Sequence, residues 1–161
     1  TSHAAGGDAV TAPVTIRDAT ASDLETIVDF NCRLAWESEQ KELNLQTLRP
    51  GVAAALADAA KARYFVAIAG EDIVGQIMCT YEWSDWRNGN LWWIQSVYVR
   101  PEFRRQGVFR ALYGHVQRLA QQSPGVAGLR LYVEHHNHVA QQVYAELGMK
   151  PAGYHVLEAI W

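Results

Sequence analysis

Residues 97–109 read Val-Tyr-Val-Arg-Pro-Glu-Phe-Arg-Arg-Gln-Gly-Val-Phe, and this stretch decides the fold. Its apolar start predicts a strand that stops at Pro101, and its basic, glycine-containing part predicts a loop that enters a helix after Gly107. The first amides of a helix have no partner within the helix, and the helix dipole adds positive charge there. The junction is therefore typical of a phosphate-binding site. Formal charge is added by Arg104, Arg105 and Arg110.

Alone, such arginines also fit an ordinary solvated helix start, but a second segment supports the phosphate site. After an apolar strand predicted over residues 129–133, the chain has the pattern Asn-x-x-Ala-x-x-x-Tyr-x-x-x-Gly-Met. Its fixed positions are Asn137, Ala140, Tyr144, Gly148 and Met149. Together, the two segments resemble the GNAT superfamily of acetyl-CoA-dependent N-acetyltransferases.

The resemblance covers roughly residues 14–161. The family's pyrophosphate signature is Arg/Gln-x-x-Gly-x-Gly/Ala, and residues 104–109 of this chain read Arg-Arg-Gln-Gly-Val-Phe. The departure is Phe109, which stands where a small residue is usual, so either the backbone approaches the phosphates less closely or Phe109 points into the core. The resemblance implies an α/β fold: a mixed, mostly antiparallel GNAT-like sheet, splayed in the middle and flanked by about four helices.

Length and composition fit one folded domain. With 161 residues, 49% of them apolar, the chain can bury one substantial core, expected over residues 14–161. Residues 1–13 are expected to be a flexible N-terminal tail, either native or left over from expression. A net charge of −3 disfavours nucleic acid as a partner. No apolar run is long enough for a membrane span and no signal peptide is recognised, so a cytoplasmic location is expected.

Metal binding and disulfide formation are not expected. Cys32 and Cys79 have neither metal-ligand spacing nor the density of a disulfide scaffold, and both are predicted to be buried thiols. His135, His136 and His138 crowd together, but neighbouring side chains at a strand end point apart, so they form a weak metal candidate.

The remaining patterns give the order of elements, starting with a strand at 14–17 and a helix from Leu24. The polar stretch 37–45 is predicted to be a loop and Pro50-Gly51 to break the chain before a helix over 52–63. Antiparallel strands are predicted at 64–69, 73–81 and 91–99, with a hairpin turn at Gly70 and a loop over 83–90. A helix from Val108 to near Pro124, a strand at 129–133, a helix at 137–147 and a closing strand at 154–161 complete the prediction.

The resemblance also implies which residues bind the donor, acetyl-CoA. Backbone groups of Val97 and Val99 would pair with the pantetheine arm like an added strand, and amides of residues 105–109 would hold the pyrophosphate. Asn137 would cap its helix and touch the pantetheine, and the cap alone would justify that residue. The full set of predicted donor-binding residues is Val97, Tyr98, Val99, Arg104, Arg105, Gln106, Gly107, Val108, Phe109, Arg110, Asn137 and Tyr144.

Acetyl transfer to an amine also needs a general base and a general acid. An alkylammonium with a pKa near ~10.4 is almost fully protonated at pH 7, so the site must help remove its proton. Candidate bases are Glu134, Glu82 and a water held by Gln95 or Ser96; Trp92 and Trp93 stand where many family members place a carboxylate. The resemblance makes Tyr144 the general acid for the departing sulfur. The alternative for Tyr144 is an ordinary core tyrosine, and for each glutamate a solvated strand end.

Aromatic and acidic residues predict the acceptor site. The candidates are Trp36, Glu37, Glu82, Trp83, Trp93 and Gln95. Tryptophan faces and carboxylates suit an organic cation, which predicts a small amine such as a polyamine, an amino sugar or an amino-acid derivative. The alternative is a solvated acidic helix end with tryptophans used in packing or in a homodimer contact.

Other functions stay open. The chain could be a non-catalytic, regulatory CoA-binding module, which the missing carboxylate at Trp92 or Trp93 favours, or a peptide N-terminal acetyltransferase. A nucleotide-binding protein is disfavoured, because the chain has neither Gly-x-x-x-x-Gly-Lys-Ser/Thr nor Gly-x-Gly-x-x-Gly.

Overall fold

The computed structural model describes residues 13–161 of the chain, so the N-terminal tail predicted over 1–13 lies almost wholly outside the described residues. The described chain forms two compact units, one ending at Leu131 and the other comprising Tyr132–Trp161. No helix within residues 13–161 is long and apolar enough to cross a membrane.

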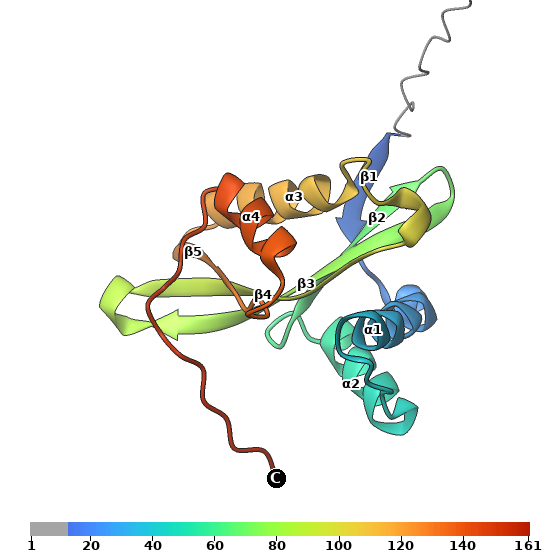
Figure 1. Cartoon of the computed structure of the whole chain (residues 1–161), viewed down its shortest axis with the longest axis horizontal. Helices are drawn as coiled ribbons and strands as arrows, with labels where there is room; N and C mark the ends of the chain where they lie inside the picture. The colour runs from blue at the N-terminus through green and yellow to red at the C-terminus, as the bar shows by residue number, and fades with distance from the viewer. Residues whose placement is uncertain (1–12) are drawn as a thin grey trace, which may run out of the picture. The chain divides into compact units, whose positions relative to one another are not determined.

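A five-stranded mixed sheet forms the centre of the first unit (Figure 1). Its strands, in spatial order, are β1 (Val14–Asp18), β2 (Arg63–Ala69), β3 (Asp72–Ser84), β4 (Gly89–Val99) and β5 (Val126–Leu131). The first four strands pair antiparallel, whereas β5 runs parallel to β4. Together with the four helices of the described chain, this confirms the predicted α/β fold class.

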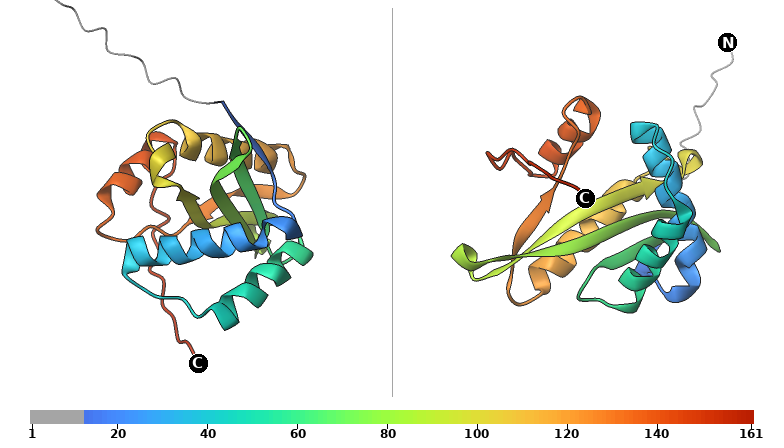
Figure 2. Two further views of the ribbon diagram at one scale, coloured as in Figure 1. Left: turned by 90° about the vertical axis from the view of Figure 1, so that its right-hand side faces the viewer. Right: turned by 90° about the horizontal axis from the view of Figure 1, so that it is seen from below.

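Helices cover both faces of this sheet. Helices α1 (Leu24–Glu39) and α2 (Leu45–Ala57) lie on one face and α3 (Val108–Gln122) on the other (Figures 1 and 2). Successive residues of β3 show the alternation expected of a strand. Gly75 faces Leu112 and Val108 of α3, while Gln76 hydrogen-bonds to Asn31 of α1. The fully buried side chains include Ile27, Phe65, Ile77, Leu112 and Val116.

Helix α2 begins and ends earlier than predicted. The sequence predicted a break at Pro50-Gly51 and a helix over 52–63, but the helix runs through Pro50. Its start is set by Asn44, whose side-chain oxygen accepts a hydrogen bond from the Gln46 amide at 2.9 Å. Pro50 is the sixth residue of this helix and removes one intrahelical hydrogen bond, a loss that the helix accommodates without ending there.

The β3–β4 hairpin is longer than predicted. Both strands extend into the expected loop 83–90 and leave only a short 3-10 turn, η2 (Asp85–Arg87), and Asn88 with a φ of 48° between them. The two-residue turn at Gly70 (φ 62°) and Glu71 is as predicted. Cys79 is fully buried as expected, whereas Cys32 is only half-buried.

The second unit contains α4 (His138–Glu146), which confirms the predicted helix to within a residue or so at each end. The predicted closing strand over 154–161 is wrong: these residues form no strand, and Leu157 and Ile160 are 91% and 82% exposed. A strand needs a neighbouring strand for its backbone hydrogen bonds, and residues 132–161 contain none. The strand predicted at 129–133 is β5, which lies a little earlier in the chain.

Candidate active site

The candidate site begins at an open edge of β4. In an antiparallel pair, successive residues direct their backbone groups alternately toward the partner strand and away from it. The Arg100 amide donates to the Val74 carbonyl oxygen of β3 at 2.8 Å, so Val97 and Val99 direct their N–H and C=O groups to the opposite edge. The parallel pairing with β5 stops at Ile94. On this edge no strand of the described chain pairs with β4 beyond that point, and the splay leaves the backbone groups of Val97 and the amide of Val99 able to bind an extended ligand.

A β-bulge lies just before this open edge. The pairing of β3 with β4 shifts between Met78 and Cys79, which leaves Gln95 as the extra residue of β4. The Gln95 side chain donates to the Thr80 hydroxyl at 2.8 Å. The neighbouring Ser96 hydroxyl is buried and has no hydrogen-bond partner within residues 13–161. A buried hydroxyl without a protein partner is a place where an ordered water commonly sits.

The strand leads into a short 3-10 turn, η3 (Pro101–Phe103), and then into the basic loop that precedes α3. Two residues of the loop, Arg105 (φ 63°) and Gly107 (φ 82°), have left-handed backbone conformations. Such a conformation is rare for arginine, and strained residues of this kind cluster at ligand sites. Helix α3 starts at Val108, so the loop brings the positive end of a four-turn helix beside the open edge of β4.

Phe109, where the family prefers a small residue, lies in the first turn of α3. Its ring is half-buried and stacks on Tyr113 one turn later, with ring centroids 6.4 Å apart. The side chain is therefore partly covered by Tyr113, a buried residue of the same helix.

Arg104 contacts three parts of the site at once. Its Nε donates to the Val99 carbonyl oxygen at 2.9 Å, and its terminal nitrogen donates to Glu37 of α1 at 2.6 Å. The guanidinium also lies 5.5 Å from the centre of the Tyr98 ring. The Tyr98 hydroxyl donates to the other oxygen of Glu37 at 3.3 Å. Burial and the charge of Glu37 raise the pKa of Tyr98, so this phenol stays protonated at neutral pH.

This cluster joins residues that the sequence assigned to different tasks. Glu37 was predicted to bind the acceptor and Arg104 the pyrophosphate, yet here each neutralises the other. Trp36, the neighbour of Glu37, is 60% exposed.

A second carboxylate, Glu82 of β3, also has an arginine partner. Arg130 of β5 donates to Glu82 at 2.8 Å, a contact that the sequence did not predict. Next to it, Trp83 is 61% exposed at the end of the β3–β4 hairpin.

Trp92 and Trp93, which occupy the strand where many family members carry a carboxylate, differ in environment. Trp92 is buried and packs edge-on against Tyr81 with ring centroids 5.9 Å apart, so it belongs to the core. Trp93 is half-buried and pairs with Thr80, on the same strand pair as Gln95.

The second unit carries Glu134, Asn137 and Tyr144. The Asn137 side chain accepts a hydrogen bond from the Ala140 amide at 3.1 Å, which confirms its role as a helix cap. Glu134 accepts from the His136 amide at 2.7 Å and so stabilises the turn before α4. Tyr144 is half-buried on α4. The roles of these residues toward a ligand bound by the first unit stay predictions.

Two further kinds of side chain bear on the chemistry, the metal-ligating residues and the cysteines. Residues 13–161 contain no group of three or more His, Cys, Asp or Glu side chains that could hold a metal ion. Burial raises the pKa of the Cys79 thiol to about 12, so this side chain is not a thiolate at neutral pH.

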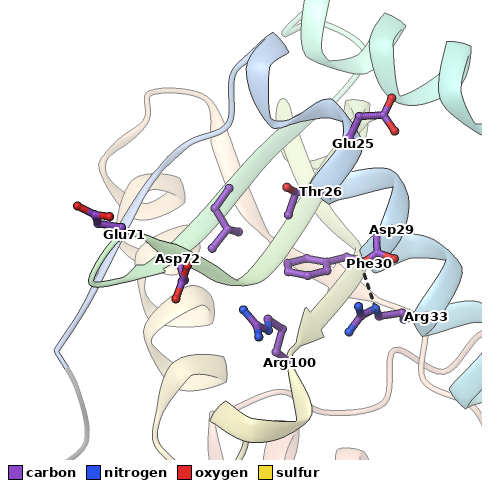
Figure 3. A pocket seen from close by; sticks show the side chains of 9 residues that line it. Glu25, Thr26, Asp29, Phe30, Arg33, Glu71, Asp72 and Arg100 are labelled. Carbon is purple, nitrogen blue, oxygen red and sulfur yellow. Dashed lines mark ion pairs between the residues drawn. The ribbon is translucent and has the colours of Figure 1, made fainter.

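A separate hollow of about 610 Å³ lies between α1 and the β2–β3 turn (Figure 3). Its lining includes Phe30, Asp29, Arg33 and Arg100. Asp29 and Arg33 form an ion pair at 3.0 Å, drawn as a dashed line in the figure. None of the residues predicted to bind donor or acceptor lines this hollow, so it is distinct from the site at the β4 edge.

Comparison with known proteins places the chain in a family. The profile of the acetyltransferase (GNAT) family matches residues 25–149, and the chain belongs to this family. A possible acetyltransferase from Clostridium difficile 630 is 44% identical, with a TM-score of 0.87 over 92% of this chain and 97% of that one. None of the curated protein sequences compared with the chain matches it.

Two more distant structures share the fold. An aminoglycoside N-acetyltransferase, AAC(6')-Iy, in complex with CoA is 18% identical, with a TM-score of 0.75 over 92% of this chain and 95% of that one. A ribosomal-protein-alanine N-acetyltransferase from Brucella melitensis biovar Abortus 2308 is 14% identical, with a TM-score of 0.73 over 92% of this chain and all of that one. Enzymes of this family use acetyl-CoA as the acyl donor. The open β4 edge and the helix start after Gly107 fit that donor, because the first can pair with an extended amide chain and the second with a diphosphate.

Proposed function

We propose that the chain is an N-acetyltransferase that transfers the acetyl group of acetyl-CoA to the primary amine of a small cationic compound. The observation that carries the proposal is the junction of the open β4 edge at Val97 and Val99 with the helix start after Gly107. An extended thioester arm bound along the edge, with its diphosphate at the helix start, leaves its sulfur toward the bulge at Gln95 and Ser96.

The residues available for chemistry support direct attack by the amine on the thioester. A covalent acetyl-enzyme on Cys79 would need a reactive thiolate, and this thiol is buried with a raised pKa. Tyr144 is proposed to give its proton to the departing sulfur, since a phenol is protonated at neutral pH. The amine's own proton is proposed to leave through a water at Ser96, or to Glu82 or Glu134. Of the three, Ser96 has a buried hydroxyl without a partner in the described part of the chain, whereas Glu82 is paired with Arg130.

The acceptor is proposed to lie on the α1 face of the sheet. Trp36 and Trp93 supply aromatic surface, and Glu37 and Glu82 supply negative charge beside it. Trp83 follows Glu82 on β3 and directs its side chain to the opposite face, so it does not join this group. Aromatic faces and carboxylates together attract organic cations. Gln95 lies on the same face through its bond to Thr80.

A thiol-release assay tests the proposal. Acetyl-CoA is supplied with a panel of polyamines, amino sugars, amino-acid amides and short peptides, and free CoA thiol is measured. We expect saturable, amine-dependent thiol release with one or more small cationic amines.

Acetylation of peptide N-termini alone would favour the second candidate, a peptide N-terminal acetyltransferase. Saturable CoA binding without thiol release for any amine would favour a non-catalytic CoA-binding module, the function that Trp92 and Trp93 at the family's carboxylate position suggest. Size-exclusion chromatography coupled to light scattering tests the possible homodimer separately.

A further inference from the structure

The contact between Arg104 and Glu37 unites the two halves of the proposed reaction site. Arg104 is the first residue of the basic loop, and Glu37 belongs to the last turn of α1, next to the exposed Trp36. Their ion pair has an N–O distance of 2.6 Å. While it persists, the carboxylate expected to attract a cationic amine is already neutralised, and so is the guanidinium expected to attract a diphosphate.

The pair is built so that it can open. The two side chains are 44% and 40% exposed, so water can replace either partner, and half-exposed ion pairs contribute little to stability. The Arg104 Nε remains fixed on the Val99 carbonyl oxygen, at the open edge of β4. With that bond as a pivot, the terminal nitrogens can turn from Glu37 toward a ligand bound along the same edge. A diphosphate offers more negative charge than one carboxylate and accepts paired hydrogen bonds from a guanidinium.

We propose that Arg104 exchanges partners when the donor binds: it leaves Glu37 for the diphosphate, and the freed Glu37 carboxylate then binds the ammonium group of the acceptor. This proposal rests on the proposed function and adds to it a coupling between the binding of acetyl-CoA and the binding of the amine. Because the affinities of two coupled ligands change each other by the same factor, bound CoA should strengthen binding of the amine, and the amine should strengthen binding of CoA.

The exchange predicts that removing the negative charge of Glu37 increases the affinity for CoA. Glu37 competes with the donor for Arg104, so Glu37→Gln should tighten CoA binding, by about 3- to 10-fold, because a neutral amide holds the guanidinium less strongly. If Glu37 only held Arg104 in a productive position, the same substitution would weaken CoA binding or leave it unchanged. Arg104→Gln should weaken CoA binding, and the double variant should resemble Arg104→Gln, because Glu37 then has no guanidinium to withhold.

Isothermal titration calorimetry on the full chain, with CoA and with inorganic diphosphate as separate probes, tests the exchange. The matched control is Glu39→Gln. Glu39 lies two residues after Glu37 and makes no ion pair among the described residues, so the substitution removes the same charge without breaking an ion pair. Its CoA affinity should stay within about twofold of the wild type. Equal tightening by both variants, or no tightening by Glu37→Gln, would overturn the exchange.

Two further results distinguish a failure of the partner exchange from a failure of the proposed acetyl transfer. If Glu37→Gln tightens CoA binding but no amine releases thiol, the exchange stands and the proposed transfer fails. If Glu37→Gln does not fold, a crystal structure of the wild-type chain with CoA decides: Arg104 on the diphosphate supports the exchange, and Arg104 still on Glu37 overturns it.

Discussion

Gly75 of β3 lies directly against Val108, the first residue of α3. A Cβ atom built on Gly75 would lie 3.3 Å from a Val108 methyl carbon, 3.2 Å from Leu112 and 3.0 Å from the Tyr98 carbonyl oxygen. The absence of a side chain at Gly75 therefore lets the start of α3 approach the sheet beside the open edge of β4.

Gly75→Ala should move or loosen this helix start. Overpacking of a tight contact costs about 1 to 3 kcal/mol, so we expect a lower free energy of unfolding and weaker CoA binding together. Urea denaturation and calorimetry measure the two effects. Gly51→Ala is the control: it lies within α2, a Cβ added there would meet no atom within 4 Å, and alanine favours a helix over glycine, so stability should rise slightly. Unchanged stability and CoA affinity in Gly75→Ala would contradict the role of this contact.

Asp23 should make the stability of the first unit depend on acid pH. The buried carboxylate accepts two hydrogen bonds from Arg17, at 2.7 and 3.0 Å, and one from the Thr20 amide at 2.8 Å. The bond to Arg17 is the main reason that the pKa of Asp23 lies below its ordinary value of 3.8. Asp23→Asn should lower the free energy of unfolding by about 1 to 3 kcal/mol at neutral pH, because it weakens charge-assisted bonds to buried groups.

The pH dependence of the stability lost in Asp23→Asn follows from the lowered pKa of Asp23. A carboxyl with a lowered pKa in the folded state contributes its full stability above the unfolded value and loses it as pH falls through the folded value. The gap between the wild type and Asp23→Asn should therefore be constant near neutrality and shrink below pH 3.8. Asp29→Asn, which breaks an exposed pair with Arg33, should change stability by less than about 0.5 kcal/mol. A gap that does not change with pH would rule out ionised Asp23 as its source.

Prediction of the fold from the sequence succeeded where short-range patterns decide the structure. The strand that ends just before Pro101, the loop at Gly107 and the helix after it were all predicted, because proline, glycine and an apolar 3.6-residue period act locally. Helix α2 was placed wrongly because the cap at Asn44 starts the helix before Pro50, and the helix continues through the proline. The strand predicted at 154–161 failed for another reason, as β-propensity alone cannot supply a pairing partner.

The candidate site was predictable only in part. The backbone sites at Val97, Val99 and Gly107 follow from motif residues adjacent in sequence. The Arg104–Glu37 and Arg130–Glu82 pairs join residues far apart in the chain, and many other pairings of charges were equally compatible with the sequence. Such contacts depend on which strands and helices meet, so they required the structure.

Ser96→Ala should separate a role in proton transfer from a role in stability. Removing a buried hydroxyl that has no protein partner among residues 13–161 costs little stability, so the free energy of unfolding should stay the same or rise slightly. If Ser96 holds the water that removes the amine's proton, turnover should fall at least about 10-fold, with CoA affinity unchanged.

Ser84→Ala is the comparison for this experiment. Ser84 is also buried on the same strand pair, but its hydroxyl accepts a hydrogen bond from Arg87 at 3.2 Å, so its loss should lower stability and leave turnover nearly unchanged. Normal turnover in Ser96→Ala would leave Glu82 and Glu134 as the candidate bases.

Tyr144→Phe tests the proposed general acid. The substitution keeps the ring and removes only the phenol hydroxyl, so CoA should bind within about twofold of the wild type while amine-dependent thiol release falls by about 10²-fold or more. Tyr154→Phe, which changes a tyrosine that is 75% exposed, should behave as the wild type in both assays. Unchanged thiol release in Tyr144→Phe would remove Tyr144 from the role of acid.

The open edge of β4 has a consequence for handling the protein. Strand edges that no neighbouring strand covers are templates for pairing with other chains, and in the described chain this edge carries β-branched apolar side chains at Val97 and Val99, with only the Val99 carbonyl bonded, to Arg104. The arrangement that accepts a ligand thus also invites self-association when no ligand covers it. Bound CoA would act as a protective edge strand, and solubility during concentration and storage would then depend on whether this edge is occupied.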